Sequence, residues 1–322
     1  MMTRLQAVPK APPQPTNLTV AAFLNKIPEN GKILVLGTHN CVSFDKLCKH
    51  FGYERCIGFD LFNPQNHPSV VIKDCDFLNN DDKSAKVGIG KSGDQTYKID
   101  KLSENVIIDV IRDNIPDCYI ISEEAGNLGK ESSDITVLID PIDGSTNAIH
   151  NIPVFSSTIL IAKGRQFSEI ISTGVYDLNN DEIFLSSENK KPTLNGKQIS
   201  VSSTEKLDSA IIAINSSTLK NIKSNTNISN LLDEIRYPRC FGSAALEIAY
   251  VANGRLDGFI DYTNTLRLFD CLPSIYSAIR SGGFIHLFNS DIKDIDIRSG
   301  SRIGIIAACS DSLGKQILSF LS

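Results

Sequence analysis

Four acidic residues follow two short apolar segments in the middle of the chain. Residues 120–121 and 136–139 are rich in β-branched side chains, which is typical of buried strands. The acids that follow these segments are Glu123, Glu124, Asp140 and Asp143. They stand where each strand is expected to stop and a turn to begin, so we expect the four carboxylates to converge on one rim. Converging acids need a cation to balance their charge.

The spacing of Asp140 and Asp143 suits a magnesium site. Mg²⁺ prefers oxygen ligands in near-octahedral geometry and keeps several waters, so its usual partners are carboxylates and substrate phosphates. Pro141 stiffens the turn between the two acids and directs both to one side. The backbone carbonyl of Ile142, which lies between them, offers a further oxygen ligand.

The three residues after Asp143 are suited to hold an anion. They are Gly144, Ser145 and Thr146. The glycine makes the turn flexible and the hydroxyls can donate hydrogen bonds. If a helix starts here, its first N–H groups are free to bind a phosphate oxygen. With two or three metal ions alongside, a bound water becomes a nucleophile near neutral pH, and the combination predicts hydrolysis of a phosphomonoester.

Each of these features has a simpler structural explanation when it is taken alone. Adjacent glutamates such as Glu123 and Glu124 are most often solvated, because charged residues are mostly exposed. Asp, Pro and Gly are the usual turn formers, so residues 140–144 are equally consistent with a plain turn. Asp100 and Asp270 alone would be helix N-caps. Their joint occurrence in this order is what favours a functional site.

The composition is that of an ordinary globular protein. The chain has 322 residues, which leaves room for two domains, and a mean hydropathy of −0.06. It has no run of about 18 apolar residues and no apolar segment near its start, so we expect a cytoplasmic protein without a membrane span. The eight cysteines include no CxxC pair and are expected to be reduced core residues. The net charge of −5 argues against a nucleic-acid partner.

The first 82 residues differ in pattern from the rest. Residues 7–19 are proline-rich and predict an extended lead-in. Strands are expected over 32–36, 55–59 and 70–73, and a helix over 43–50. This order, with Gly37 after the first strand and Asp60 after the second, is similar to a partial Rossmann-like βαβ unit that binds nucleotides. Only one glycine of the glycine-rich fingerprint is present, so an accessory layer packed on the main domain is the alternative.

After a polar boundary near residue 82, strands dominate first and strands alternate with helices later. Helices are expected over 102–114, preceded by Asp100, over 244–252, ending at Asn253-Gly254, and from Asp270 to residue 279. Strands or apolar runs are expected over 155–162, 170–176, 182–186, 210–214, 256–261 and 302–308. The Asn195-Gly196 pair predicts a tight hairpin.

Five segments together point to a known family, and DPIDGSTN with the upstream glutamate pair and the downstream Asp270 is highly specific in combination. The segments are residues 91–100, SEEAG at 122–126, DPIDGSTN at 140–147, residues 241–258 and LRLFD at 266–270. Together they resemble the inositol monophosphatase superfamily of metal-dependent, lithium-sensitive sugar phosphatases, most closely its archaeal-type fructose-1,6-bisphosphatase/inositol monophosphatase branch. The resemblance implies an α/β fold, an αβαβα layered sandwich. We expect it over residues 83–322, with a metal-site half at 83–205 and a C-terminal half at 206–322, preceded by an N-terminal module at 1–82.

The resemblance also implies a role for each matching residue. The implied ligands of two or three Mg²⁺ ions are Glu123, Asp140, Asp143, Asp270 and the carbonyl of Ile142. Asp100 and Ser145 would activate the attacking water, and Glu124 would support the metal ligands. The implied substrate-binding residues are Gly144, Ser145, Thr146, Arg239, Ser243, Ala244 and Arg267. The two arginines would suit a second phosphate, although ordinary surface arginines are the alternative.

These roles predict Mg²⁺-dependent hydrolysis of a small sugar or polyol phosphate. Fructose-1,6-bisphosphate is the first choice of substrate, inositol monophosphate the second, and a 3′(2′),5′-bisphosphate nucleotide the third. A regulatory or binding protein that uses the same fold and its N-terminal module is the alternative from another class. The resemblance further implies a homodimer, and we expect no nucleic-acid or membrane partner.

Some positions depart from the family pattern. Ser122 stands where Gly is common, and Phe269 where Trp is common, and both changes leave the implied ligands intact. Pro273 is expected in the first turn of the helix after Asp270, where a missing N–H costs little. The long amphipathic helix that opens relatives is not found, and residues 20–80 stand in its place. That segment either covers the same face of the core or leaves an apolar surface for a partner.

Overall fold

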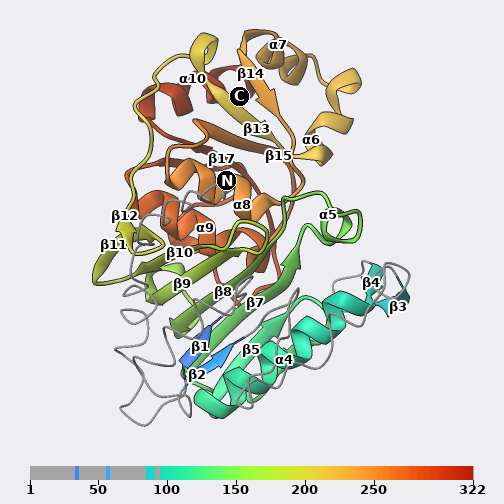
Figure 1. Cartoon of the computed structure of the whole chain (residues 1–322). Helices are drawn as coiled ribbons and strands as arrows, with labels where there is room; N and C mark the ends of the chain where they lie inside the picture. The colour runs from blue at the N-terminus through green and yellow to red at the C-terminus, as the bar shows by residue number, and fades with distance from the viewer. Residues whose placement is uncertain (1–32, 36–55, 59–84, 91–94, 322) are drawn as a thin grey trace, which may run out of the picture.

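Two β-sheets and the helices packed on them make up most of the chain (Figure 1). The computed structural model describes residues 33–35, 56–58, 85–90 and 95–321. Near the N-terminus, β1 (Ile33–Val35) pairs in parallel with β2 (Cys56–Gly58), as the sequence predicted for the first two strands. The proline-rich segment, the helix over 43–50, the strand over 70–73 and the boundary near residue 82 lie outside the described residues.

The larger sheet has eight strands in the order β12-β11-β10-β9-β8-β7-β5-β6. Its strands are β5 (Cys118–Ser122), β6 (Gly126–Leu128), β7 (Ile135–Asp143), β8 (Ser156–Lys163), β9 (Ile170–Asp177), β10 (Glu182–Ser187), β11 (Lys190–Leu194) and β12 (Lys197–Gln198). Only β5 and β7 run parallel. Asn195 and Gly196 join β11 to β12 with φ angles of 45° and 85°, so the predicted hairpin is confirmed, because its turn needs positive φ at both positions.

The smaller sheet has five strands in the order β14-β13-β15-β17-β16. They are β13 (Ile211–Ile214), β14 (Tyr237–Arg239), β15 (Gly258–Arg267), β16 (Phe284–Leu287) and β17 (Arg302–Ala308). The strand expected at 256–261 therefore starts later and runs six residues further, with an irregular register between Asp261 and Leu266. A separate small antiparallel pair, β3 (Lys86–Ile89) and β4 (Gln95–Tyr97), precedes the first long helix.

Helices cover the sheets on three levels (Figure 1). They are α4 (Lys98–Asn114), α5 (Ser145–Ile149), α6 (Ser216–Lys220), α7 (Thr226–Glu234), α8 (Ala244–Ala252), α9 (Leu268–Arg280) and α10 (Asp311–Leu321). The first packs on one face of the eight-stranded sheet, α8 and α9 lie between the two sheets, and α7 and α10 cover the far face of the smaller sheet. This is the predicted αβαβα order. The chain leaves the eight-stranded sheet after β12 and enters the five-stranded sheet at β13, and the domain division near residue 205 stays a prediction.

Alternating side chains explain why the layers stack in this way. In β7, Val137 and Ile139 pack on the side of α4, whereas Leu138 packs toward α8 and α9. In β13, Ala213 faces the central helices, and Ile212 and Ile214 face α7 and α10. Successive side chains of a strand point to opposite faces, so strands that are apolar at every position must be covered on both sides.

Two helices begin earlier than the sequence predicted. Asp100 and Asp270 were expected to precede or cap their helices, but each is the third residue of its helix, in α4 and α9. The Asp100 carboxylate accepts a hydrogen bond from the N–H of Tyr97, the N-cap residue, at 3.1 Å. An acid at this position satisfies an unpaired N–H group as a capping residue would, which is why the pattern was misassigned. The helix over 244–252 is confirmed, and Gly254 has the positive φ of a helix stop.

Pro273 is the sixth residue of α9, in the second turn and not the first. A residue there would normally donate its N–H to the carbonyl of Phe269. Proline has no such donor, and the Thr158 hydroxyl donates to that carbonyl instead, at 2.8 Å. The helix therefore continues through the proline because a side chain of β8 satisfies the freed backbone group.

The cysteines are partly as expected. Cys118, Cys271 and Cys309 are free and buried, but Cys240 is free and exposed, so the prediction that all are core residues is wrong at that position. No helix in the described part of the chain is both long and apolar enough to cross a membrane.

Candidate metal and phosphate site

The acids predicted to converge come from three elements. Ser122 pairs with Ile139 in the parallel register of β5 and β7, so Glu123 and Asp140 are the next residues along two adjacent strands. Asp143 ends β7, and Asp270 lies in the first turn of α9. Glu123, Asp140, Asp143 and Asp270 interact electrostatically with one another. The structure thus brings together the four side chains that the sequence proposed as metal ligands.

The strand that carries Asp140 does not stop at that residue, contrary to the sequence prediction. β7 continues to Asp143, and its pairing with β8 gains one extra residue between the two acids. Asp140 accepts a hydrogen bond from the N–H of Ile142 at 2.9 Å. A bulge of this kind re-aims side chains without ending the strand, and here it separates the two acids along one edge.

Burial is the main reason why the acids hold protons more tightly than usual. It raises the pKa of Glu123 and Asp140 well above the ordinary range, and neighbouring carboxylates raise both further. It raises the pKa of Asp143 to about 6, against the hydrogen bond from Ser243, and that of Asp270 to about 7. Negative charge is therefore costly at this place unless a cation accompanies it.

These shifts predict how stability depends on pH in the presence of EDTA. The carboxyl pKa values are near 3.8 for Asp143 and Asp270 in an unfolded chain, and about 6 and 7 in the folded one. Between the unfolded and the folded pKa values, the folded state therefore binds more protons than the unfolded chain does. The stabilisation that these protons give is lost as the pH rises through the folded-state pKa values. We expect the free energy of unfolding in urea to fall from pH 5 to pH 8, and Mg²⁺ to reverse the fall at pH 8. A rise over this range without metal would contradict the assignment.

The donor set fits a hard divalent cation. All the candidate ligands are oxygens, and Asp270 Oδ1 is buried without a hydrogen-bond partner among the described residues. No three Asp, Glu, His or Cys side chains in the described part of the chain are arranged so that they could hold a metal ion as they stand. The Glu123 and Asp140 carboxyl groups are linked by a hydrogen bond, and Glu123 also forms an ion pair with Arg267.

Asp143 is held by the start of α8. Its carboxylate accepts hydrogen bonds from the Ser243 hydroxyl at 2.6 Å and the Ala245 N–H at 2.8 Å, and the Ala244 N–H lowers its pKa. A helix N-terminus favours a negative charge through its unpaired N–H groups and its dipole. Ser243 is fully buried, so its side chain positions a candidate ligand here.

Asp100 lies beside the phosphate turn. Burial raises its pKa to about 6, while the Ser145 hydroxyl lowers it. That hydroxyl also donates to the carbonyl of Ile142 at 2.9 Å. Asp100 Oδ1 is buried and has no hydrogen-bond partner among the described residues. Asp100 and Ser145, the predicted pair of acid and hydroxyl, are therefore close in space. Asp100 Oδ1 accepts a hydrogen bond from no described residue.

Glu124 and Glu123 are adjacent in the chain but lie in different surroundings. Glu124 is buried, accepts a hydrogen bond from the Thr96 hydroxyl and interacts with Asp100. Gly90 packs against the same carboxylate, because a Cβ atom at that position would stand 2.1 Å from its Oε2. The solvated-loop alternative for the two glutamates is therefore wrong for Glu124.

Glu104 is a site residue that the sequence reasoning missed. It is fully buried on α4, and its Oε1 accepts from the Ser122 hydroxyl and from the N–H groups of Glu124 and Ala125 at 3.1 and 2.7 Å. One carboxylate thereby fixes the turn that carries Glu123. The signal available in the sequence was its spacing of four from Asp100, which places both on one face of the helix. The Ser122 side chain, at a position where Gly is common in the family, has a structural role here because its hydroxyl donates to Glu104.

The phosphate turn is tied to distant segments. Gly144 has φ of +88°, and a Cβ atom there would lie 3.1 Å from the carbonyl oxygen of Val154, so a larger residue would be strained. Ser145 begins α5 as predicted, and Thr146 is exposed. Asn147, which the sequence reasoning also missed, donates to the carbonyls of Val154 and Phe241, both at 2.7 Å. The last residue of DPIDGSTN therefore anchors the turn to the segment before α8.

The two predicted substrate arginines have different surroundings. Arg267 is mostly buried, forms the ion pair with Glu123 and stacks over the Phe269 ring at 5.7 Å. Arg239 is exposed on the edge strand β14, where it donates to the carbonyl of Pro238 at 2.9 Å. Among the described residues it makes no ion pair. Arg267 is therefore part of this site by direct contact, and Arg239 shows no such contact.

Comparison with known proteins agrees with this architecture. A model of the inositol monophosphatase family matches residues 70–277. The chain is 32% identical to "Fructose-1,6-bisphosphatase" of Pyrococcus furiosus, over 76% of its length and 91% of that protein. It is 35% identical to "Nus factor SuhB" of Escherichia coli K12, over 61% and 73% respectively. A solved structure described as an inositol monophosphatase-fructose 1,6 bisphosphatase superposes with a TM-score of 0.65 at 30% identity, over 75% of this chain and 91% of that one.

The chain therefore belongs to the inositol monophosphatase family, as the sequence resemblance indicated. Within that family it is a phosphoric monoester hydrolase.

Proposed function

We propose that this protein hydrolyses the phosphomonoester of a small sugar or polyol in the presence of Mg²⁺. The observation that carries the proposal is the group of four interacting acids, buried or nearly so, beside the paired Asp100 and Ser145. Buried like charges are costly, and a divalent cation would offset that cost at this place. The similarity to a fructose-1,6-bisphosphatase supports the same activity.

The proposed ligands of two or three Mg²⁺ ions are Glu123, Asp140, Asp143, Asp270 and the carbonyl of Ile142. When bound, such ions lower the pKa of a water molecule and stabilise charge on the leaving oxygen. Glu104 and the start of α8 hold two of these acids in place, and Glu124 supports the turn between them. Supporting contacts of this kind orient ligands and tune their affinity.

The remaining groups would handle the water and the phosphate. Asp100 Oδ1 would accept a proton from the attacking water, which Ser145 helps to orient, and its raised pKa suits a base near neutral pH. The N–H groups and hydroxyls of Gly144, Ser145 and Thr146 would hold the phosphate oxygens, with Ser243 and Ala244 closer to the sugar. The reaction adds water across the P–O bond and releases an alcohol and inorganic phosphate.

Fructose-1,6-bisphosphate is the preferred substrate in this proposal, ahead of inositol monophosphate and of a 3′(2′),5′-bisphosphate nucleotide. The mostly buried Arg267 supports a second phosphate, because a guanidinium group binds phosphate in a bidentate manner. Arg239 supports it less, because it is exposed and bonded within its own strand. A homodimer and inhibition by lithium remain predictions of the family resemblance, and a cytoplasmic location remains a prediction from the sequence.

A regulatory role is the second candidate. The observation that favours it is the 35% identity to a protein named Nus factor SuhB. In that case residues 1–82 or another surface would recognise a partner, and phosphate chemistry would be dispensable.

The first test is phosphate release by the purified protein with Mg²⁺. Fructose-1,6-bisphosphate and myo-inositol-1-phosphate are compared, each with and without lithium. We expect release from the bisphosphate and inhibition by lithium. Release from the inositol ester alone would keep the metal site and overturn the preferred substrate. Release from neither, by a folded protein that binds Mg²⁺, would overturn both substrates and favour the regulatory role.

A further inference from the structure

The first turn of α9, which carries Asp270, lacks one of the backbone hydrogen bonds of an ordinary helix. Pro273 is the sixth residue of α9 and has no N–H group to donate to the carbonyl of Phe269, four residues earlier. That carbonyl belongs to the peptide group that joins Phe269 to Asp270. The proline thus removes the usual donor from the backbone group directly before a proposed metal ligand.

The side chain of Thr158 takes over the role of this donor. Its hydroxyl donates to the carbonyl of Phe269 at 2.8 Å, and Thr158 is only 1% exposed. In the antiparallel register of β7 and β8, Thr158 lies directly opposite Asp140. Neighbouring strands are only about 4.8 Å apart. One side chain therefore connects the strand beside Asp140 with the helix turn that carries Asp270.

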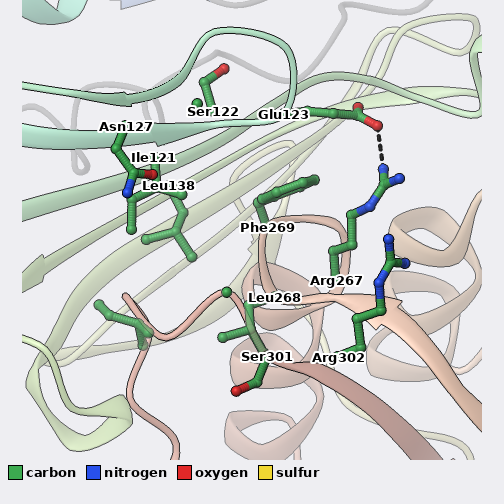
Figure 2. Close-up of a pocket in the computed structure, with 13 residues that line it drawn as sticks. Ile121, Ser122, Glu123, Asn127, Leu138, Arg267, Leu268, Phe269, Ser301 and Arg302 are labelled. Atoms are coloured by element: carbon green, nitrogen blue, oxygen red, sulfur yellow. Dashed lines mark hydrogen bonds and ion pairs between the residues drawn. The ribbon is translucent and has the colours of Figure 1, made fainter. Parts of the chain in front are cut away.

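Packing restrains this turn incompletely, because a cavity of about 290 Å³ lies against it (Figure 2). Leu268 and Phe269 of the turn line the cavity together with Ile121 and Leu138 of the larger sheet. Figure 2 shows Phe269 in the middle of these lining residues. Atoms that face a cavity lose packing contacts on that side. The hydrogen bond from Thr158 therefore contributes more to the position of the turn than it would in a fully packed helix.

Asp270 needs an exact position if it is to bind a metal ion. Its carboxylate accepts a hydrogen bond from the N–H of Arg267, the N-cap residue, and its Oδ1 is buried without a hydrogen-bond partner among the described residues. Mg²⁺ requires near-octahedral geometry with ligands at about 2.0–2.1 Å. A peptide group is planar, so a bond to the Phe269 carbonyl also orients the backbone N and Cα of Asp270.

We propose that Thr158 is a positioning residue of the metal site. Through the carbonyl of Phe269 it sets Asp270 relative to Asp140, and Pro273 makes the site depend on Thr158. With any other residue at position 273, the helix itself would supply an N–H group for that carbonyl. The inference rests on the proposed function, because that function makes Asp140 and Asp270 ligands of Mg²⁺.

The test is a double-mutant cycle of Thr158→Val and Pro273→Ala, with each change alone and both together. Valine has a shape close to that of threonine but no hydroxyl, and Pro273→Ala restores the backbone donor. The measurements are Mg²⁺ affinity by calorimetry and the urea midpoint of unfolding in EDTA. We expect Thr158→Val alone to weaken Mg²⁺ binding about 10- to 100-fold and to lower the midpoint. In the presence of Pro273→Ala, the same change should weaken Mg²⁺ binding less than about 3-fold.

Two further variants distinguish positioning from general loss of stability. Thr158→Ser keeps the hydroxyl and should keep the Mg²⁺ affinity, even where the lost methyl group lowers the midpoint. Thr173→Val is the control, because Thr173 is a fully buried threonine of β9 whose hydroxyl has no hydrogen-bond partner among the described residues. It should bind Mg²⁺ as the wild-type protein does. A lower midpoint with unchanged Mg²⁺ affinity in Thr158→Val, or an equal loss of affinity with and without Pro273→Ala, would overturn the proposal.

Phosphate release separates a failure of this inference from a failure of the proposed function. Release from fructose-1,6-bisphosphate is measured against Mg²⁺ concentration, and we expect Thr158→Val to need about 10- to 100-fold more Mg²⁺ for its half-maximal rate. The same Mg²⁺ dependence in the wild-type protein and Thr158→Val would overturn the positioning role and keep the proposed function. No release by any of the proteins, with the expected changes in Mg²⁺ affinity, would overturn the proposed function and keep the positioning role.

Discussion

Replacing Asp140 by Asn is expected to abolish phosphate release while the protein stays folded. The loss should reach at least about 1000-fold, because Asp140 is a proposed metal ligand and bound metal ions would supply several kcal/mol of stabilisation to the transition state. The Asn side-chain oxygen can still accept the hydrogen bond from the N–H of Ile142. The measurement is kcat with saturating Mg²⁺ and substrate, together with Mg²⁺ affinity by calorimetry.

The same variant is expected to be more stable than the wild-type protein in EDTA. Burial and the neighbouring carboxylates raise the pKa of Asp140, so a neutral side chain at this position removes an unfavourable charge from the folded state. Asp109→Asn, an exposed change on α4, is the control. It should change neither the rate of phosphate release nor the stability in EDTA. An Asp140→Asn protein that keeps its activity would remove the metal role. One that loses activity but keeps its biological function would favour the regulatory role.

Replacing Glu104 by Ala is expected to weaken Mg²⁺ binding about 10- to 100-fold, although Glu104 would not contact the metal. Without its carboxylate, the N–H groups of Glu124 and Ala125 and the Ser122 hydroxyl are left buried and unpaired. Each costs about 1–3 kcal/mol, so the free energy of unfolding should also fall by several kcal/mol. The measurements are calorimetry with Mg²⁺ and urea unfolding in EDTA.

Ser122→Ala is the matched control, because it removes one of the three donors and leaves the carboxylate in place. It should weaken Mg²⁺ binding much less than Glu104→Ala does. Unchanged Mg²⁺ affinity in a folded Glu104→Ala protein would show that the turn keeps its shape without the buried carboxylate.

Much of the fold was predictable because its signals are local. Alternating and continuous apolar runs predicted most strands of both sheets, and Asn195-Gly196 and Asn253-Gly254 predicted a hairpin and a helix end. Strand ends that carry acids were less predictable. β7 runs through Pro141 to Asp143, although Asp and Pro usually favour turns, because pairing with β8 outweighs the local preference.

The helix starts at Asp100 and Asp270 were misplaced for a related reason. An acid three residues into a helix bonds the N-cap N–H, and in the sequence it resembles the cap itself. Pro273 was placed one turn too early as a result. Only the tertiary structure shows why its position is tolerated, since the donor to the carbonyl of Phe269 is Thr158, which lies more than 100 residues away.

The sequence by itself determined the kind of site: the acids, their spacing and the phosphate turn lie in short segments whose chemistry does not depend on distant residues. The tertiary structure decided which of these groups meet and what holds them. The parallel register of β5 and β7 places Glu123 beside Asp140, and α8 binds Asp143. Glu104 accepts hydrogen bonds from the turn that carries Glu123, and Arg267 lies beside Arg302 across β15 and β17. Both contacts arise only when segments far apart in the chain pack together. Such contacts depend on long-range packing, which no local pattern encodes.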